Sequence, residues 1–192
     1  FYQVIVRASR APLRVDSIYE TFLAAPVATL RHLGLPATLE GTNEIEVRGR
    51  RIAGTGGGRI GDAMVMTGNL LLDFPYALMT RAWRTPSPAF RRLAGRALRR
   101  SVTTIRRELD KAPSIDVLKE LLVQGFRETL MRPVAVGSLT PAEMGAIREA
   151  EAELLERPDE GSLVREERVL KIARGVYIRQ ANGRPARGIR AS

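Results

Sequence analysis

The stretch from Gly54 to Gly61 constrains the fold most, because five of its eight residues are glycine. Glycine loses more conformational freedom on folding than any other residue, so the run is not expected to form regular structure. Short strands are predicted on its N-terminal side, at residues 38–40, 44–47 and 51–53, and a buried strand at 63–72 follows it. The sequence therefore predicts a strand–loop–strand unit. The backbone amides of its loop can approach a phosphate or carboxylate closely.

The rest of the chain alternates between strand-like and helix-like patterns. Further strands are expected at residues 2–7, 133–139, 170–172 and 176–178. Helices are expected at residues 16–32 with Asp16 as the N-cap, at 76–109 with a break at two prolines, at 116–131 and at 140–157. The last of these begins with Thr140, Pro141 and Glu143, the pattern of an N-cap, a first-turn proline and a capping box. Residues 158–161 are interpreted as a linker, and the chain from Ala181 as an unfinished tail.

The amino-acid composition argues against several kinds of catalytic, metal and membrane-spanning site. The chain contains no cysteine, which excludes disulfides, thiolate metal sites and a cysteine nucleophile within these 192 residues. His32 is the single histidine, so a serine–histidine–aspartate triad or a multi-histidine zinc site has almost no material. No apolar run reaches the roughly 18 residues of a membrane span, and no membrane partner is expected.

The charge balance is strongly basic, with 31 Lys and Arg residues against 21 Asp and Glu, a net charge of +10. Five arginines lie close together at positions 91, 92, 96, 99 and 100. The arginine excess is open to two interpretations: genomic base composition with a solvated helix face, or an electropositive surface for an acidic partner. Aromatic residues make up 5% and do not interleave with the basic clusters, which makes nucleic acid an unlikely partner. A nucleic-acid-binding module stays as a second alternative function.

Four segments together resemble a known family. Asn43 and Glu44 open a predicted strand, and the element from Gly49 to Gly54 (GRRIAG) follows. Residues 68–73 (GNLLLD) and 101–109 (SVTTIRREL) come later in the same order. This arrangement resembles the lipoate–protein ligases of the biotin/lipoate A/B protein ligase family, as an internal or C-terminal portion of the catalytic domain. The resemblance implies an α+β fold with a mixed, largely antiparallel sheet and packed helices.

The resemblance also implies an activity. Such ligases use ATP and Mg²⁺ in the cytoplasm to convert lipoate to lipoyl-adenylate. They then transfer the acyl group to a lysine of a lipoyl carrier domain of a 2-oxoacid dehydrogenase or of the glycine-cleavage H protein. Such carrier domains are commonly acidic, so a basic surface on the ligase would steer them. Related octanoyltransferases and lipoyl amidotransferases use a cysteine nucleophile, so the lack of cysteine favours the ATP-dependent ligase. Biotin ligases are a weaker match. A non-catalytic or accessory subunit that binds the acyl ligand or the carrier domain is the first alternative.

The site residues follow from the same resemblance. Arg51 stands at the position of the family's catalytic lysine, where a cation stabilises developing charge. Asn43 and Glu44 match the pair that helps to hold Mg²⁺ and ATP, with glutamate in place of aspartate. The remaining residues expected to bind ATP or the acyl-adenylate are Gly54, Thr55, Gly56, Gly57 and Gly68.

The expected organisation is a catalytic portion over residues 1–139, a helix and linker over 140–160, and the start of a small accessory domain or a tail over 161–192. The family's arginine- and glycine-rich segment would precede Phe1. An upstream segment or an accessory subunit is therefore an expected partner. We expect the isolated chain to make no lipoyl-adenylate and to associate through the unpaired edge of its first strand.

Overall fold

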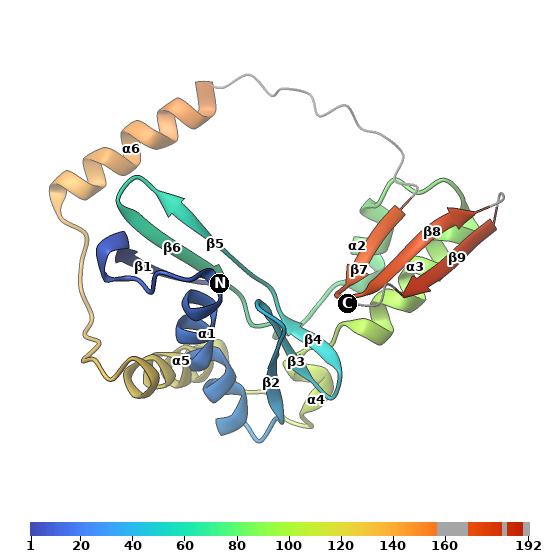
Figure 1. Cartoon of the computed structure of the whole chain (residues 1–192), viewed down its shortest axis with the longest axis horizontal. Coiled ribbons are helices and arrows are strands. Elements are labelled where there is room, and N and C mark those ends of the chain that lie inside the picture. Colours follow the sequence, from blue (N-terminus) through green and yellow to red (C-terminus); the bar gives the residue numbers. More distant parts are fainter. Residues whose placement is uncertain (157–168, 182–183, 190–192) are drawn as a thin grey trace.

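The computed structural model describes residues 1–156, 169–181 and 184–189. Within them the chain forms three three-stranded antiparallel sheets (Figure 1). The first has the order β1 (Tyr2–Arg7), β6 (Ala63–Gly68), β5 (Thr55–Ile60). The second contains β2 (Ala37–Glu40), β3 (Glu44–Val47) and β4 (Arg50–Ala53), and the third β7 (Val169–Ala173), β8 (Val176–Ala181) and β9 (Arg184–Ile189). The predicted α+β class with antiparallel pairing is confirmed.

The first two sheets are joined through one residue. Gly54 separates β4 from β5, and its carbonyl accepts a hydrogen bond from the backbone N–H of Asn69 at 3.0 Å. Two residues earlier in the chain, the carbonyl of Ile52 on β4 accepts a hydrogen bond from the N–H of Leu71, also at 3.0 Å. The chain that leaves β6 therefore continues alongside β4, and the two sheets share this connection.

The helices follow the predicted boundaries, except that the stretch predicted at 76–109 is interrupted a second time at residues 102–104. They are α1 (Val15–His32), α2 (Tyr76–Ala82), α3 (Pro88–Ser101), α4 (Ile105–Glu108), α5 (Ile115–Leu130) and α6 (Pro141–Glu156), with a 3₁₀ turn η1 at Ala8–Arg10. The expected cap of α1 at Asp16 is wrong, because Arg14 occupies the N-cap position and Asp16 lies in the first turn. The capping box of α6 is confirmed: Thr140 and Glu143 exchange backbone and side-chain hydrogen bonds.

Two main cores hold the elements together. Leu23 and Leu30 of α1 are buried against Ile45 and Ile52 of the second sheet. Helix α1 also packs along α5, where a Cβ at Gly125 would lie 2.8 Å from the carbonyl oxygen of Ala25. Glycine at this position therefore permits a close approach of the two helices, which lie side by side in Figure 1.

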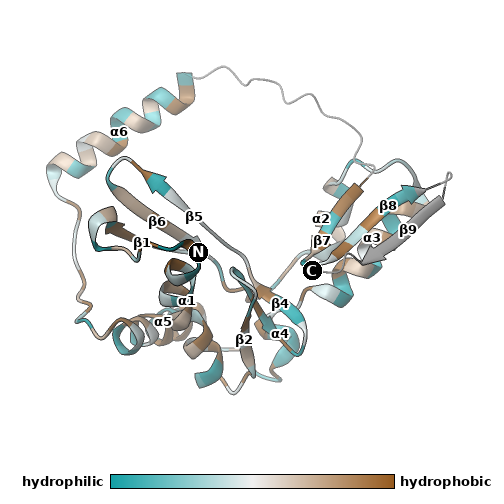
Figure 2. Ribbon diagram, in the orientation of Figure 1, coloured by the Kyte–Doolittle hydropathy of each residue, from teal (hydrophilic) through white to brown (hydrophobic). Residues whose placement is uncertain are grey.

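The second core joins the third sheet to α3. Phe90 and Leu98 of α3 are buried with Ile172 of β7 and Ile178 of β8. Strands β7 and β8 carry hydrophobic residues where they lie over α3 (Figure 2). The third sheet is thus packed against residues of the predicted catalytic portion.

Several predictions about strands and loops also fail. The strand predicted at 63–72 ends at Gly68. The glycine run is not a loop, because residues 55–60 form strand β5. Residues 133–139 form no strand. Pro133 has no N–H to donate to a neighbouring strand, and the carbonyl of Val134 accepts a hydrogen bond from the guanidinium of Arg127 instead. The predicted tail contains β9, which pairs with β8 from Val176 to Ala181. The predicted linker at 158–161 lies outside the described residues.

Strand β5 forms because pairing with β6 satisfies its backbone. Each residue from Thr55 to Ile60 has a partner between Gly68 and Ala63. A Cβ at Gly57 would lie 3.0 Å from the carbonyl oxygen of Val65, so that position also favours glycine on steric grounds. The cost in conformational entropy is offset by ladder hydrogen bonds that a glycine-rich sequence does not itself reveal.

Candidate functional site

The candidate site is centred on Arg51 and Glu44, which come from adjacent strands. Nη1 of Arg51 on β4 lies 3.9 Å from Oε1 of Glu44 on β3. Glu44 is 7% exposed, whereas the Arg51 side chain remains 32% exposed. The arrangement places a solvent-accessible guanidinium beside a buried carboxylate. The structure thus brings these two predicted site residues together.

The backbone of Arg51 is held from the other side by residues 102 and 103. Arg51 and Val102 form a parallel β-bridge, and the N–H of Thr103 donates to the carbonyl of Arg51 at 2.9 Å. Val102 and Thr103 are both fully buried. The segment predicted at 101–109 therefore supports the strand that carries Arg51.

A second contact joins Asn43 to the start of the glycine strand. The hydroxyl of Thr55 donates to the backbone carbonyl of Asn43 at 2.5 Å. The backbone N–H of Gly54 donates to Oδ1 of Asn69 at 2.8 Å. Four of the predicted residues, Asn43, Glu44, Gly54 and Thr55, thus lie within one hydrogen-bonded corner, and Asn69 is a further member of it.

The glycines differ in their surroundings. Gly56 and Gly58 face open space, since a Cβ at either position would meet nothing within 4 Å. Gly68 is buried, and a Cβ there would lie 2.3 Å from the ring of Tyr2. The open side of β5 leaves room for a ligand. Gly68, in contrast, is needed for packing against Tyr2, a role that the sequence did not reveal.

The third sheet contributes a residue that sequence reasoning missed. The backbone N–H of Arg174, in the turn between β7 and β8, donates to Oε2 of Glu44 at 3.3 Å. Its guanidinium lies against Gly41, where a Cβ would stand 1.4 Å from Nη1. The two oxygens of Glu44 thus face Arg51 and Arg174, residues 123 positions apart in the chain. No local sequence signal could have indicated this contact.

Three carboxylates, those of Glu40, Glu44 and Glu46, interact electrostatically near this contact. Burial raises the pKa of Glu46, and the nearby charges of Glu40 and Glu44 raise it further. The charge of Arg174 acts in the opposite direction and lowers the pKa of Glu46. Arg174 therefore offsets part of the repulsion among these three carboxylates.

A second ion-pair network, which the sequence did not predict, is centred on Glu108 and includes Arg50, the neighbour of Arg51 on β4. The Glu108 side chain is 2% exposed and accepts hydrogen bonds from Nη1 of Arg48 at 2.5 Å and Nη2 of Arg50 at 2.6 Å. The hydroxyl of Thr103 also donates to it. Burial alone would raise the pKa of Glu108, but the hydrogen bonds from Thr103 and Arg48, with the charges of Arg50 and Arg48, outweigh it and lower the pKa.

The donors present are compatible with Mg²⁺ bound together with a nucleotide. Within the described ranges no cluster of three or more His, Asp or Glu side chains could hold a metal by itself. Mg²⁺ commonly uses one or two carboxylates plus substrate phosphates and waters. Oε1 of Glu44, which lies 3.9 Å from Arg51 and so accepts no hydrogen bond from it, would supply that limited set together with the exposed Asn43. The open face beside Gly56 and Gly58 offers space for phosphates.

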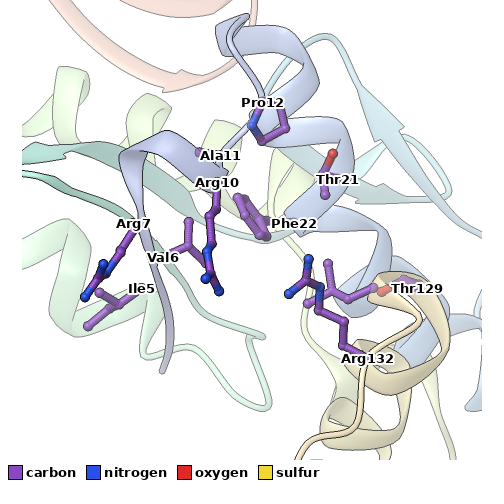
Figure 3. A pocket seen from close by; sticks show the side chains of 11 residues that line it. Ile5, Val6, Arg7, Arg10, Ala11, Pro12, Thr21, Phe22, Thr129 and Arg132 are labelled. Carbon is purple, nitrogen blue, oxygen red and sulfur yellow. The ribbon is translucent and has the colours of Figure 1, made fainter.

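A separate cavity of about 850 Å³ contains none of the predicted site residues. It is bounded by β1, η1, α1 and the end of α5 (Figure 3). Arg10 and Arg132 extend toward it from opposite sides, and the ring of Phe22 lies between them in this view. The corner around Arg51 and this cavity are therefore two separate features of the structure, and the predicted site residues belong to the first.

Comparison with known proteins identifies the family of the chain. Residues 1–127 match the lipoyl protein ligase A/B catalytic domain, and the chain belongs to that family. It is 27% identical over 166 residues to the octanoyltransferase LipM of Symbiobacterium thermophilum, covering 74% of this chain and 60% of that protein. The chain therefore spans less than two thirds of this curated relative.

Solved structures show the same fold. A bi-partite lipoate protein ligase from Thermoplasma acidophilum, analysed with its E2 lipoyl domain, gives a TM-score of 0.74 at 23% identity, over 86% of this chain and 64% of that one. A lipoate-protein ligase A bound with ATP gives 0.63 at 22% identity, over 79% and 60%. Across the described residues, no helix combines the length and apolar character needed to cross a bilayer.

Proposed function

We propose that the chain carries the adenylation site of an ATP-dependent lipoate–protein ligase. In this reaction a lipoate carboxylate oxygen attacks the α-phosphorus of ATP and pyrophosphate leaves. The amine of a carrier-domain lysine then attacks the acyl carbonyl, losing a proton as AMP departs. The observation that carries the proposal is the accessible Arg51 guanidinium beside buried Glu44, within the catalytic domain of this family. The lack of cysteine supports it further.

The residues of the corner have distinct roles in this proposal. Arg51 holds a positive charge where negative charge grows on the phosphate and acyl oxygens, a form of stabilisation that needs no rearrangement. Glu44 orients Arg51 and, with Asn43, provides oxygen ligands for Mg²⁺. Thr55 and Gly54 keep the start of β5 in place through Asn43 and Asn69. Gly56 leaves the backbone of β5 unobstructed on its open face, whereas Gly57 permits close packing against Val65 and Met66 of β6.

Octanoyl transfer is the second candidate, because the curated relative is named an octanoyltransferase. A transferase that passes an acyl group through a thioester needs a thiol nucleophile. The 192 residues contain none. We therefore place ATP-dependent activation first, with a lipoyl carrier domain as the acceptor and lipoate as the acid.

The test follows lipoate-dependent release of pyrophosphate. The assay uses the chain joined to the upstream and accessory segments that the family resemblance implies, and the chain alone for comparison. Arg51→Ala should reduce the rate about a hundred- to a thousand-fold, since one preorganised donor or cation is typically worth about 3–4 kcal/mol. Arg51→Lys should retain or raise the rate, and Arg148→Ala on α6 serves as a charge-matched control.

Two results would contradict the proposal. The first is an Arg51→Ala variant that works within threefold of the parent. The second is ATP-independent transfer of octanoate from an octanoyl-carrier donor, with no pyrophosphate released from ATP and lipoate. That result would assign the chain to the transferase branch of the family.

A further inference from the structure

The groove between α2 and α3 has an unusual charge distribution. Between Asp73 and Glu108 the sequence contains nine arginines and no acidic residue. Five of these arginines line a groove of about 470 Å³: Arg81, Arg91, Arg92, Arg96 and Arg99. All five are exposed. No acidic side chain contributes to its lining, so the groove carries charge of one sign.

Most of these arginines have no charged or hydrogen-bonding partner in the part of the chain that the structure describes. Arg81, Arg91, Arg92 and Arg96 form no ion pair or hydrogen bond with the described parts of the chain. Arg99 lies over the ring of Tyr76, 5.2 Å from its centroid, and leaves its charge accessible. A solvated helix face normally mixes both signs, and acidic residues are favoured near a helix N-terminus. Helix α3 has no acid there and places Arg91 and Arg92 close to that end.

The opposite face of α3 is packed, which fixes the helix face that carries the arginines. Phe90, Ala94, Ala97 and Leu98 are buried, and the third sheet covers them. A Cβ at Gly95 would lie 3.2 Å from Cγ2 of Thr80, so α2 and α3 approach closely along the floor of the groove. The guanidinium groups therefore stand on a backbone that packing holds on two sides.

We propose that this arginine groove docks the acidic surface of the carrier domain that receives the acyl group. The inference rests on the proposed function for the identity of the partner. Planar guanidinium groups bind carboxylates in bidentate pairs, and charge of one sign steers an oppositely charged protein toward the site. Helix α3 ends at Ser101, directly before Val102 and Thr103, which hold the backbone of Arg51. A carrier seated on α3 therefore lies on an element that leads to the reaction centre.

Nucleic acid is the competing occupant, since arginines also bind phosphates. The groove has no exposed aromatic side chain among its lining residues on which bases could stack. Its lining instead includes Ala77, Pro88 and Gly95, small groups that admit the side chains of a folded protein surface. These features favour the protein partner.

The test measures equilibrium binding and association rate of an unmodified lipoyl carrier domain with an acidic surface to the 192-residue chain. The variant Arg91→Glu/Arg92→Glu/Arg96→Glu reverses three charges at exposed helix positions. Glutamate is a good helix former and is favourable near a helix N-terminus, so the fold should persist. The matched control, Arg7→Glu/Arg10→Glu/Arg132→Glu, makes the same charge change around the separate cavity.

We expect the α3 variant to lose at least tenfold in association rate at low salt, in line with the roughly 10–10³-fold effect of steering. The control should change it less than threefold, and Arg91→Lys/Arg92→Lys/Arg96→Lys should recover most of the steering. Equal losses in the two glutamate variants would overturn the inference. So would undetectable carrier binding, or tighter binding to a double-stranded DNA oligonucleotide that depends on the same three arginines.

Pyrophosphate release separates this inference from the proposed function. In the joined protein, lipoate activation without a carrier should be the same in the parent and in the α3 variant. If no activation occurs but the carrier binds through α3, the ligase assignment fails and the docking surface stands. If activation occurs and the α3 variant binds the carrier normally, the docking surface fails alone.

Discussion

Glu108 offers the sharpest test of how the candidate site is supported. Its buried carboxylate connects three donors: Arg48 in the turn before β4, Arg50 at the first position of β4, and Thr103. Thr103 in turn binds the carbonyl of Arg51. The substitution Glu108→Gln keeps the volume and removes the charge. It should therefore loosen the strand that presents Arg51 without opening a cavity.

The expected loss of unfolding free energy in Glu108→Gln follows from the burial of Glu108 and the exposure of its two arginine partners. Removing one partner of a fully buried ion pair costs about 3–5 kcal/mol. The Arg48 side chain is 54% exposed, so water strongly screens its interaction with Glu108. The Arg50 side chain is 29% exposed, so its interaction with Glu108 is screened less. The glutamine still offers one carbonyl oxygen to Thr103, so we expect a loss of about 2 kcal/mol in unfolding free energy. For a chain of this size that corresponds to a fall in Tm of roughly 4–8 °C.

Urea unfolding, followed by circular dichroism and by fluorescence of Trp83, measures the difference. The control is Glu128→Gln, which removes an exposed carboxylate that lies 3.8 Å from His32. That substitution should cost less than about 0.5 kcal/mol. Equal small losses in both variants would refute the view that Glu108 supports the Arg51 strand.

The pH dependence gives an independent check of the same reasoning. The pKa of Glu108 is lowered in the folded state, so its stabilisation is fully present above its ordinary pKa. That stabilisation is lost as pH falls toward the lowered value. The difference between parent and Glu108→Gln should therefore be constant near neutrality and shrink below about pH 4. A difference that grows on acidification would contradict the assignment.

Substitutions at other positions lead to further predictions about stability. Gly68→Ala should destabilise by about 1–3 kcal/mol because its Cβ would overlap the ring of Tyr2, while Gly56→Ala, which faces open space, should cost under about 1 kcal/mol in denaturant unfolding. Burial raises the pKa of Tyr2 well above its usual range, so absorbance at alkaline pH should show late ionisation and stability should fall above about pH 10. Tyr2→Phe should remove that loss. Gly41→Ala must displace the guanidinium of Arg174 and strain a φ of +58°, so proteolysis should release the third sheet more readily.

Local sequence chemistry predicted the elements that depend on neighbouring residues. The capping box of α6 formed as expected because Thr140 and Glu143 are three residues apart and can pair whatever surrounds them. Helix α5 lies within a residue of its predicted bounds, with Ser114 as its N-cap. The family motifs likewise lie in order along one stretch, so the sequence alone was enough to select Asn43, Glu44 and Arg51 as candidate site residues.

Partners distant in sequence decided what local patterns could not. The glycine run became a strand because β6 supplies hydrogen bonds residue by residue, and β9 formed because β8 offered an open edge. Glu108 and Arg174 joined the site through contacts that span 58 and 130 residues. Motif and capping signals come from covalent spacing, so the sequence contains them outright. Ladder pairing and buried charge networks depend on which surfaces meet, and only the folded chain determines that.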